Sequence, residues 1–288
     1  MSELILVTGS NGRFAKVLKD KNKFLQLKFL NKKDLNILSI RSIEKAVNKY
    51  KPKTILHCAA LSRPMSIHDT DISKSINLNI IGTANVVKVC LKYNIKIIYF
   101  STGYVYECTK GNYKESDAVK PFNNYGLSKL AGECSVQMYK NSLILRITMT
   151  EKPFIHKKGY TNLYSNYMYH EDLVKILPRL IHKFGIINVG GKLRSVYNFG
   201  KLNNKKILKT KPATPVTTGT QIPPSKIGIQ KLREELENAK NKGKLSVSDT
   251  STYMKHYDDW KSSKGDKAKK DEHLKGLRDL YKQLLYKK

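Results

Sequence analysis

Two segments of the chain carry residue types suited to proton transfer. Tyr125 and Lys129 are four residues apart, the spacing that places two side chains on one face of a helix. A nearby ammonium group lowers a tyrosine pKa, which brings the Tyr125 phenol towards the range useful for acid–base chemistry. Ser101 and Thr102 follow the apolar residues 97–100, which predict a buried strand. We therefore expect these four side chains to form a catalytic site at a strand end.

A glycine-rich turn near the N-terminus has the context of a dinucleotide-binding fingerprint. The aliphatic residues before it predict a strand, and the residues after it predict a helix. Gly9 permits a tight turn, Gly12 lets the backbone approach a pyrophosphate, and Ala15 allows close packing of the helix on the strand. A purely structural turn is the alternative. The predicted cofactor-binding residues of this segment are Gly9, Ser10, Asn11, Gly12, Arg13 and Phe14.

Two further strand ends complete the predicted cofactor site. After the second predicted strand, a cation would accept the 2′-phosphate of NADP, whereas an acidic residue would bind the ribose of NAD. Lys32 and Lys33 favour NADP there, and Asp34 leaves NAD open. Ala59 and Ala60 follow the third predicted strand, where small side chains allow the backbone to contact a cofactor. NADP is therefore the preferred cofactor, with NAD as the alternative.

Predicted strands alternate with predicted helices over residues 1–205. The strands are expected at residues 4–7, 25–29, 54–57, 97–100, 143–145 and 186–189, and the helices include residues 41–49, 77–93, 125–139 and 170–180. This alternation predicts an α/β fold with a doubly wound, Rossmann-like parallel sheet that binds ligands at the carboxyl ends of its strands. Thr and Pro residues predict a linker at residues 206–224. Apolar residues at helical spacing predict a basic helical extension at residues 225–288.

The net charge of +31 raises the question of a polyanionic partner. It reflects 54 Lys and Arg residues against 23 Asp and Glu residues. In the extension, lysines alternate with aromatic residues that could stack on bases. These aromatic residues are Tyr253, Tyr257, Trp260, Tyr281 and Tyr286. A packed helical seam under a charged, solvated face is the preferred interpretation, so nucleic-acid binding is the alternative to docking on a protein partner.

The remaining chemistry-bearing residues predict neither a metal site nor a membrane anchor. The four cysteines lack C-x-x-C spacing, which indicates reduced thiols. The N-terminal residues lead into a strand without a signal peptide, and no run of about 18 apolar residues occurs. His170, Glu171 and Asp172 begin a predicted helix, where acidic residues complement the helix dipole. We expect a cytoplasmic protein without metal.

Taken in order, five segments resemble the extended short-chain dehydrogenase/reductase family, and most closely its dTDP-4-dehydrorhamnose reductase branch. They are residues 8–15, 57–60, 79–83, 101–106 and 125–129, and the resemblance covers roughly residues 3–205. It implies an NADP- or NAD-dependent oxidoreductase of carbohydrate biosynthesis. Its substrate would be a nucleotide-linked 4-keto-6-deoxysugar that receives hydride at C4. A homodimer is a further expectation from the resemblance.

The resemblance also implies a role for each residue of the site. Tyr125 would donate the proton, Lys129 would lower its pKa and hold the nicotinamide ribose, and Thr102 would bind the carbonyl oxygen. Ser101 would assist, and Asn79 would belong to the cofactor-binding residues. The cofactor carries the reductive chemistry, while the protein supplies orientation and the proton.

Three departures from the family pattern leave alternatives open. Gly103 stands where the branch usually carries an acid, and only 23 residues separate Arg146 from His170, which predicts a small, reduced substrate lobe. The family's C-terminal substrate region is not recognisable in residues 210–288. One alternative is a non-catalytic, cofactor-binding Rossmann protein whose basic tail binds a protein or nucleic-acid partner. The other is a nucleotide-sugar epimerase or dehydratase on the same scaffold.

Overall fold

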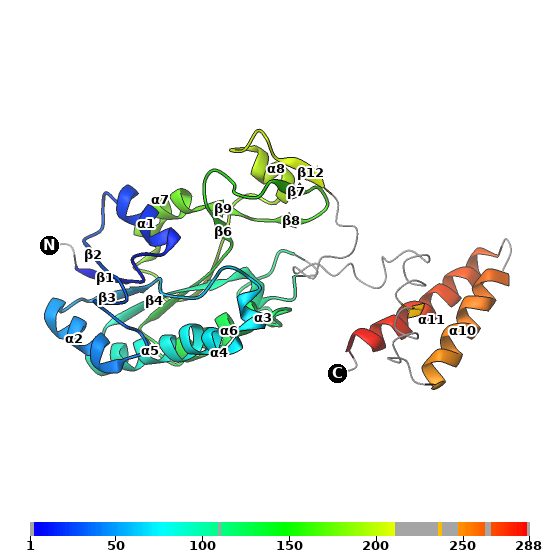
Figure 1. The fold of residues 1–288 in the computed structure, drawn as a ribbon, viewed down its shortest axis with the longest axis horizontal. Coiled ribbons are helices and arrows are strands. Elements are labelled where there is room, and N and C mark those ends of the chain that lie inside the picture. Colours follow the sequence, from blue (N-terminus) through cyan, green and yellow to red (C-terminus); the bar gives the residue numbers. More distant parts are fainter. Residues whose placement is uncertain (1–2, 109–110, 211–235, 238–246, 263–265, 287–288) are drawn as a thin grey trace. The chain divides into compact units, whose positions relative to one another are not determined.

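The chain forms two compact units, Met1–Thr220 and Gln221–Lys288 (Figure 1). The computed structural model describes residues 3–108, 111–210, 236–237, 247–262 and 266–286. Each unit has a hydrophobic core of its own.

The first unit is built on a six-stranded parallel sheet with the order β10-β5-β4-β3-β1-β2. Its strands are β1 (Ile5–Thr8), β2 (Leu27–Leu30), β3 (Thr54–His57), β4 (Lys96–Thr102), β5 (Ser142–Ile147) and β10 (Gly185–Val189). β1, β3, β4 and β5 are buried along their whole length, because helices cover both faces of the sheet. This arrangement confirms the predicted doubly wound α/β fold.

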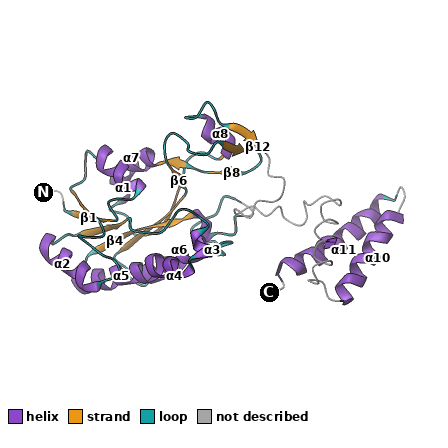
Figure 2. Cartoon of the chain, viewed as in Figure 1, coloured by secondary structure: helices purple, strands orange, loops and turns teal. Residues whose placement is uncertain are grey.

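Helices lie on both sides of the sheet (Figure 2). One face is covered by α1 (Arg13–Lys21) and α7 (His170–Leu180), and the other by α2 (Ile40–Tyr50), α5 (Gly82–Tyr93) and α6 (Asn124–Gln137). Short helical segments connect β3 to α5 and β4 to α6. They are α3 (Ile67–Thr70), α4 (Ile72–Ser75), the π-helix η1 (Ile76–Ile81) and the 3-10 turn η2 (Gly103–Val105).

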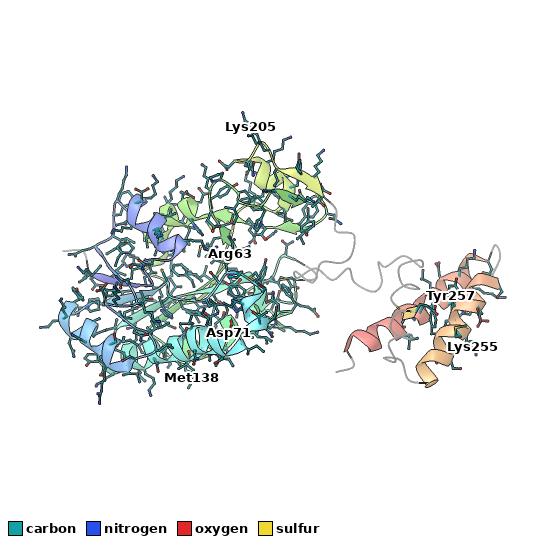
Figure 3. All side chains as sticks on the ribbon, viewed as in Figure 1. Arg63, Asp71, Met138, Lys205, Lys255 and Tyr257 are labelled. Atoms are coloured by element: carbon teal, nitrogen blue, oxygen red, sulfur yellow. The ribbon has the colours of Figure 1, made fainter. Side chains whose placement is uncertain are left out.

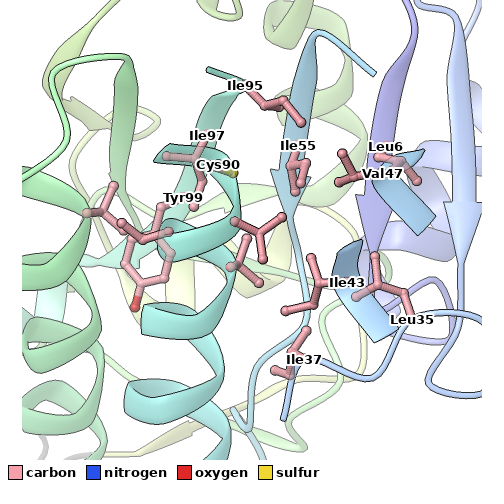
Figure 4. Packing of buried hydrophobic residues seen from close by; sticks show 14 of the residues in the cluster. Leu6, Leu35, Ile37, Ile43, Val47, Ile55, Cys90, Ile95, Ile97 and Tyr99 are labelled. Carbon is pink, nitrogen blue, oxygen red and sulfur yellow. The ribbon is translucent and has the colours of Figure 1, made fainter. Parts of the chain in front are cut away.

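The larger core cluster lies between the sheet and the α2–α5–α6 layer (Figure 4). Leu6, Ile55 and Ile97 project from three neighbouring strands, and Ile43 and Val47 of α2 belong to the same cluster. Burial of such side chains contributes about 1.5–3 kcal/mol each to folding. The sheet is therefore a rigid platform, and its strand ends hold fixed positions.

A small lobe follows β5 and has a separate, aromatic core. Its elements are β6 (Met149–Thr150), β7 (Lys158–Tyr160), β8 (Tyr164–Ser165), β9 (Met168–Tyr169), β11 (Arg194–Ser195), α8 (Val196–Lys201) and β12 (Leu208–Thr210). Phe154, Tyr169 and Phe199 form the centre of this core together with Val196 and Ile207. The predicted linker begins at residue 206, yet Ile207 is buried and β12 pairs with β7, so these residues belong to the lobe. Residues 211–224 lie outside the described residues.

The second unit contains the helices α10 (Val247–Ser262) and α11 (Lys267–Tyr286). Leu236, Tyr253, Leu277 and Leu280 form its core, and the Tyr253 hydroxyl donates a hydrogen bond to Glu237 at 2.7 Å. Tyr253 therefore serves packing, while the side chains of Trp260, Tyr281 and Tyr286 lie outside the described residues. Among the described helices of both units, none combines the length and apolarity needed to cross a bilayer.

A buried ion pair joins α6 to the strands β4 and β5. Arg146 of β5 and Glu133 of α6 are 3% and 0% exposed, and their charged atoms lie 2.6 Å apart. Ser101 donates a hydrogen bond to the same Glu133 carboxylate, and Arg146 donates one to the Tyr106 hydroxyl. These bonds hold the helix that carries Tyr125 against the strand that ends in Thr102.

We expect the change Glu133→Gln to destabilise the first unit strongly. It leaves the buried Arg146 charge without its counter-ion, a loss that typically costs about 3–5 kcal/mol. The free energy of unfolding from denaturant titration checks this value. Glu44→Gln is the matched control, because Glu44 pairs with the exposed Lys92 and its loss should change stability little. Equal stability of the two variants would contradict this view of the pair.

Candidate active site

The start of α6 places the tyrosine and the lysine. Asn123 caps the helix, since its side-chain oxygen accepts a hydrogen bond from the Gly126 N–H at 2.7 Å. Tyr125 therefore lies in the first turn, and Lys129 lies one turn further on. A Cβ atom at Gly132 would come within 2.4 Å of the Asn79 carbonyl oxygen, so only glycine lets α6 approach the segment before α5 this closely.

Tyr125 is half-buried, and Thr102 at the end of β4 is its hydrogen-bond partner. Burial raises its pKa above the ordinary value, whereas a hydrogen bond with Thr102 and the charges of Arg13 and Arg63 act in the opposite direction. The sequence predicted that Lys129 would lower this pKa. In the structure burial outweighs the neighbouring charges, so Tyr125 keeps its proton at neutral pH, the form that a proton donor requires.

Lys129 is buried, with its ammonium group 4.1 Å from the centre of the Tyr99 ring. Burial lowers the pKa of Lys129 to about 7, and the acidic groups of Glu133 and Cys58 oppose this shift. A cation over an aromatic face is stabilised by the ring quadrupole. Lys129 is therefore an amine whose charge changes near neutral pH.

Ser101 and Asn79, both predicted site residues, are held by bonds within the protein. The Ser101 hydroxyl binds Glu133, as described above. The Asn79 side chain accepts a hydrogen bond from the Leu61 N–H at 2.7 Å and donates to the Leu61 carbonyl and the Ser128 hydroxyl, each at 2.9 Å. Asn79 thus ties the loop after β3 to α6, which is a positioning role.

The glycine turn fits the pyrophosphate of a dinucleotide. Gly9 has a φ of 65°, and a Cβ atom there would lie 2.6 Å from the Ala59 Cα. Gly12 is the residue before α1. Because glycine has no side chain, no side-chain group caps the first N–H groups of that helix. Such N–H groups attract phosphate. Ala59 is fixed beside the turn because its N–H donates to the Thr8 hydroxyl at 3.1 Å.

The other predicted residues of this turn differ in what they contribute. The Ser10 N–H donates to the Leu30 carbonyl at 3.1 Å, and Asn11 is exposed. The Phe14 ring packs in the core against Phe100, at 5.1 Å between ring centres, so its side chain serves packing. Arg13 forms an ion pair with Glu151 at 3.0 Å.

Arg63 and Glu151 were missed by sequence reasoning. Arg63 also pairs with Glu151 at 3.0 Å, and Figure 3 shows it between the sheet and the part of the chain that carries β6 and β9. The two arginines reach this carboxylate from α1 and from the loop after β3, while Glu151 directly follows β6. The distances in sequence, 138 and 88 residues, leave no local pattern to find.

The end of β2 carries Lys32 and Asp34 on a tight turn. Asp34 accepts a hydrogen bond from the Asn31 N–H at 3.3 Å, and Asn31 accepts one from the Lys33 N–H at 2.7 Å. Lys32, Lys33 and Asp34 are all exposed, as is Ala60 after β3. The turn thus presents two cations and one carboxylate beside the glycine turn, which Ser10 joins to β2.

His170, Glu171 and Asp172 form the first turn of α7, as the sequence predicted for a helix start. Across the described part of the chain, no group of three or more His, Cys, Asp or Glu side chains is placed to hold a metal ion.

A cavity of about 210 Å³ opens beside Tyr125. Three hydroxyl groups, one carboxylate, two amides and an imidazole belong to its lining residues, together with the tyrosine rings. Its lining residues are Met65, Ser66, His68, Asp69, Tyr104, Asn123, Asn124 and Tyr125. Such a mixture of aromatic surface and hydrogen-bonding groups suits a small polar ring compound.

The lowered pKa of Lys129 predicts a pH dependence of stability in the cofactor-free protein. The folded-state pKa is about 7 and the ordinary value is 10.5, so between these values the unfolded state binds more protons. Stability should therefore rise from pH 7 to pH 9 by up to about 1.4 kcal/mol per pH unit relative to Lys129→Met. Subtracting the variant cancels the other titrating groups. Parallel pH profiles of the two proteins would contradict the assignment.

Comparison with known proteins gives three likenesses. The chain is 33% identical to methionine adenosyltransferase 2 subunit beta of Xenopus laevis over 114 residues, 39% of this chain and 34% of that protein. It is 28% identical to dTDP-4-dehydrorhamnose reductase of Aggregatibacter actinomycetemcomitans over 152 residues, 51% of each chain. The chain thus spans between about a third and about half of the length of these curated relatives.

The third likeness is structural. The fold matches dTDP-4-dehydrorhamnose reductase of Bacillus anthracis, solved with NADP, with a TM-score of 0.65 and 24% identity, over 74% of this chain and 86% of that one. The family model for the RmlD substrate binding domain matches residues 2–155, which confirms the resemblance found in the motifs. Because this match covers more than half of the sequence, the chain belongs to the RmlD substrate binding domain family.

Proposed function

We propose that the chain is an NADP- or NAD-dependent reductase of a nucleotide-linked 4-keto-6-deoxysugar. The observation that carries this proposal is the hydrogen bond between Tyr125, which lines the polar cavity, and Thr102 at the end of β4, with Lys129 one turn further along α6. The names of the Aggregatibacter and Bacillus relatives support the reaction and the substrate class.

The residues present fit a dinucleotide cofactor. The turn at Gly9 and Gly12 would hold the pyrophosphate, and Lys129 would hold the nicotinamide ribose. Lys32 and Lys33 would bind a 2′-phosphate, which favours NADP. When bound, the reduced nicotinamide supplies the hydride.

The protein's own part of the reaction is orientation and one proton. Thr102, fixed at the end of β4, hydrogen bonds to the substrate carbonyl oxygen and holds it beside Tyr125. Tyr125 donates its phenolic proton to that oxygen as negative charge develops there. Arg13 and Arg63 stabilise the resulting phenolate, since both charges lower the pKa of Tyr125. Lys129, one turn after Tyr125 on α6, would hold the ribose of the bound cofactor.

The cavity and the small lobe limit the substrate. A volume of about 210 Å³ beside Tyr125 is of the size of one sugar ring. At Gly103, where the branch usually has an acid, a Cβ atom would lie 2.8 Å from the Thr148 hydroxyl, so an acid would need a different local packing. The compact lobe, from β6 to β12, would cover the nucleotide end of the substrate.

We expect Tyr125→Phe to abolish most of the activity. Loss of a general acid typically lowers kcat by about 10²–10⁴-fold, because no other positioned group supplies the proton. The measurement is NADPH consumption with dTDP-4-dehydrorhamnose, together with NADPH binding, which should stay unchanged.

Tyr93→Phe is the matched control for this experiment. Tyr93 ends α5 at the opposite edge of the sheet, so this change should leave the rate at the wild-type value. A Tyr125→Phe variant that keeps the wild-type rate would rule out the assigned proton donor.

The cofactor preference predicts a second result. Lys32→Ala should raise the Kd of NADPH about fivefold, because an exposed ion pair typically contributes up to about 1 kcal/mol. The Kd of NADH should stay unchanged, since NADH has no 2′-phosphate. Fluorescence titration of both nucleotides measures the ratio. Lys19→Ala, an exposed lysine in the last turn of α1, is the control that should alter neither value. If NADH binds more tightly than NADPH to the wild type, NAD is the cofactor.

A second candidate function is that of a non-catalytic, cofactor-binding partner protein. The likeness to a protein named as a subunit of an adenosyltransferase favours it, as does the small size of the lobe. Cofactor binding without reduction of any 4-keto-6-deoxysugar nucleotide by the wild type would support this candidate. The predicted homodimer and the partner of the helical extension stay predictions.

A further inference from the structure

His68 lies in the cavity beside Tyr125 and has no part in the proton transfer described above. It belongs to the short helix α3, is 1% exposed, and its ring centre lies 5.0 Å from that of Tyr125. Both residues line the same cavity of about 210 Å³. A ligand in this cavity therefore has both rings in its wall.

One nitrogen of this ring is bound and the other is not. Nδ1 lies 2.7 Å from the hydroxyl of Ser75, which is 3% exposed and ends α4. Nε2 is buried and has no hydrogen-bond partner among the described residues. A buried polar atom without a partner costs about 1–3 kcal/mol, so a site that keeps one in place has a use for it.

The chemistry of the ring indicates what it binds. Burial lowers the pKa of His68, and the nearby Asp69 carboxylate opposes the shift only in part, so the imidazole is neutral at neutral pH. A neutral ring attracts a phosphate weakly. Because the Ser75 hydroxyl can donate to Nδ1 or accept from it, Nε2 can take either role, and this suits a hydroxyl group, which also donates and accepts.

The surroundings favour a hydroxyl on a sugar ring. Asn124 donates a hydrogen bond to the Asp69 carboxylate at 2.8 Å, which joins α3 to α6 at the cavity. Tyr104 contributes an aromatic ring, placed edge-on to Tyr125 at 6.1 Å between ring centres. Carboxylate, amide and aromatic groups around one small space are typical of carbohydrate recognition.

We propose that Nε2 of His68 hydrogen bonds to a hydroxyl group of the same sugar ring whose carbonyl oxygen Tyr125 protonates. This inference rests on the proposed function and deepens it, because it makes His68 a specificity residue for the sugar. Ser75 is the positioning residue that orients the imidazole.

The test compares two ligands that differ only by the sugar. The full chain, saturated with NADP, is titrated calorimetrically with dTDP-rhamnose and with dTDP. His68→Phe keeps a planar ring but removes the nitrogen, so dTDP-rhamnose should bind about tenfold more weakly while dTDP binds as before. In turnover of dTDP-4-dehydrorhamnose, KM should rise about tenfold with little change in kcat, as expected for a uniform binding contact.

Two further variants make the result specific. Ser75→Ala should weaken the binding of dTDP-rhamnose about threefold and leave the binding of dTDP unchanged, because the imidazole loses the group that orients it. His182→Phe is the matched control, since His182 is exposed just after α7, and it should change neither affinity.

The outcomes separate a failure of the proposed nucleotide-sugar function from a failure of the role of His68. If the wild type binds neither ligand, the nucleotide-sugar function is overturned, and the role of His68 with it. If the wild type binds both and His68→Phe leaves their ratio unchanged, only the role of His68 is overturned. Should His68→Phe not fold, the same two affinities are measured for His68→Gln. We then expect dTDP-rhamnose to bind about threefold more weakly than to the wild type, with the affinity for dTDP unchanged. An unchanged ratio of the two affinities would overturn the inference.

Discussion

The ion pair between Glu133 and Arg146 is the constraint on which the site depends. It is fully enclosed, and removing two charges from water is favourable only when their geometry and hydrogen bonds are well satisfied. Ser101 and Tyr106 provide those bonds, and the network holds α6 against β4 and β5. The carboxylate thus positions the part of α6 that carries Tyr125 and Lys129 relative to the two strands.

Burial also sets the protonation states of the site. The same low-polarity surroundings raise the pKa of Tyr125 and lower that of Lys129, since both shifts disfavour the charged form. At neutral pH the tyrosine is therefore protonated, and the lysine lies near its midpoint. His57, bound on both ring nitrogens by threonines, is neutral for the same reason, with its pKa lowered to about 3.

Much of the fold could be predicted because its signals are local. The predicted strand at residues 54–57 and helix at residues 170–180 match β3 and α7 at both ends. The roles of Ser101, Asn79 and Phe14 could not be predicted, since each depends on a partner far away in sequence: Glu133, Ser128 and Phe100. His68 carries no motif, and only the folded chain brings it to Tyr125.

The small lobe has a core of its own, centred on Phe154, Tyr169 and Phe199, separate from the two clusters that flank the sheet. Substitutions in one core therefore affect the packing of the other weakly, because their energies add independently when residues share no partners. Loops of the lobe can change in length or sequence while the packing of the sheet, and with it the position of its strand ends, stays as it is.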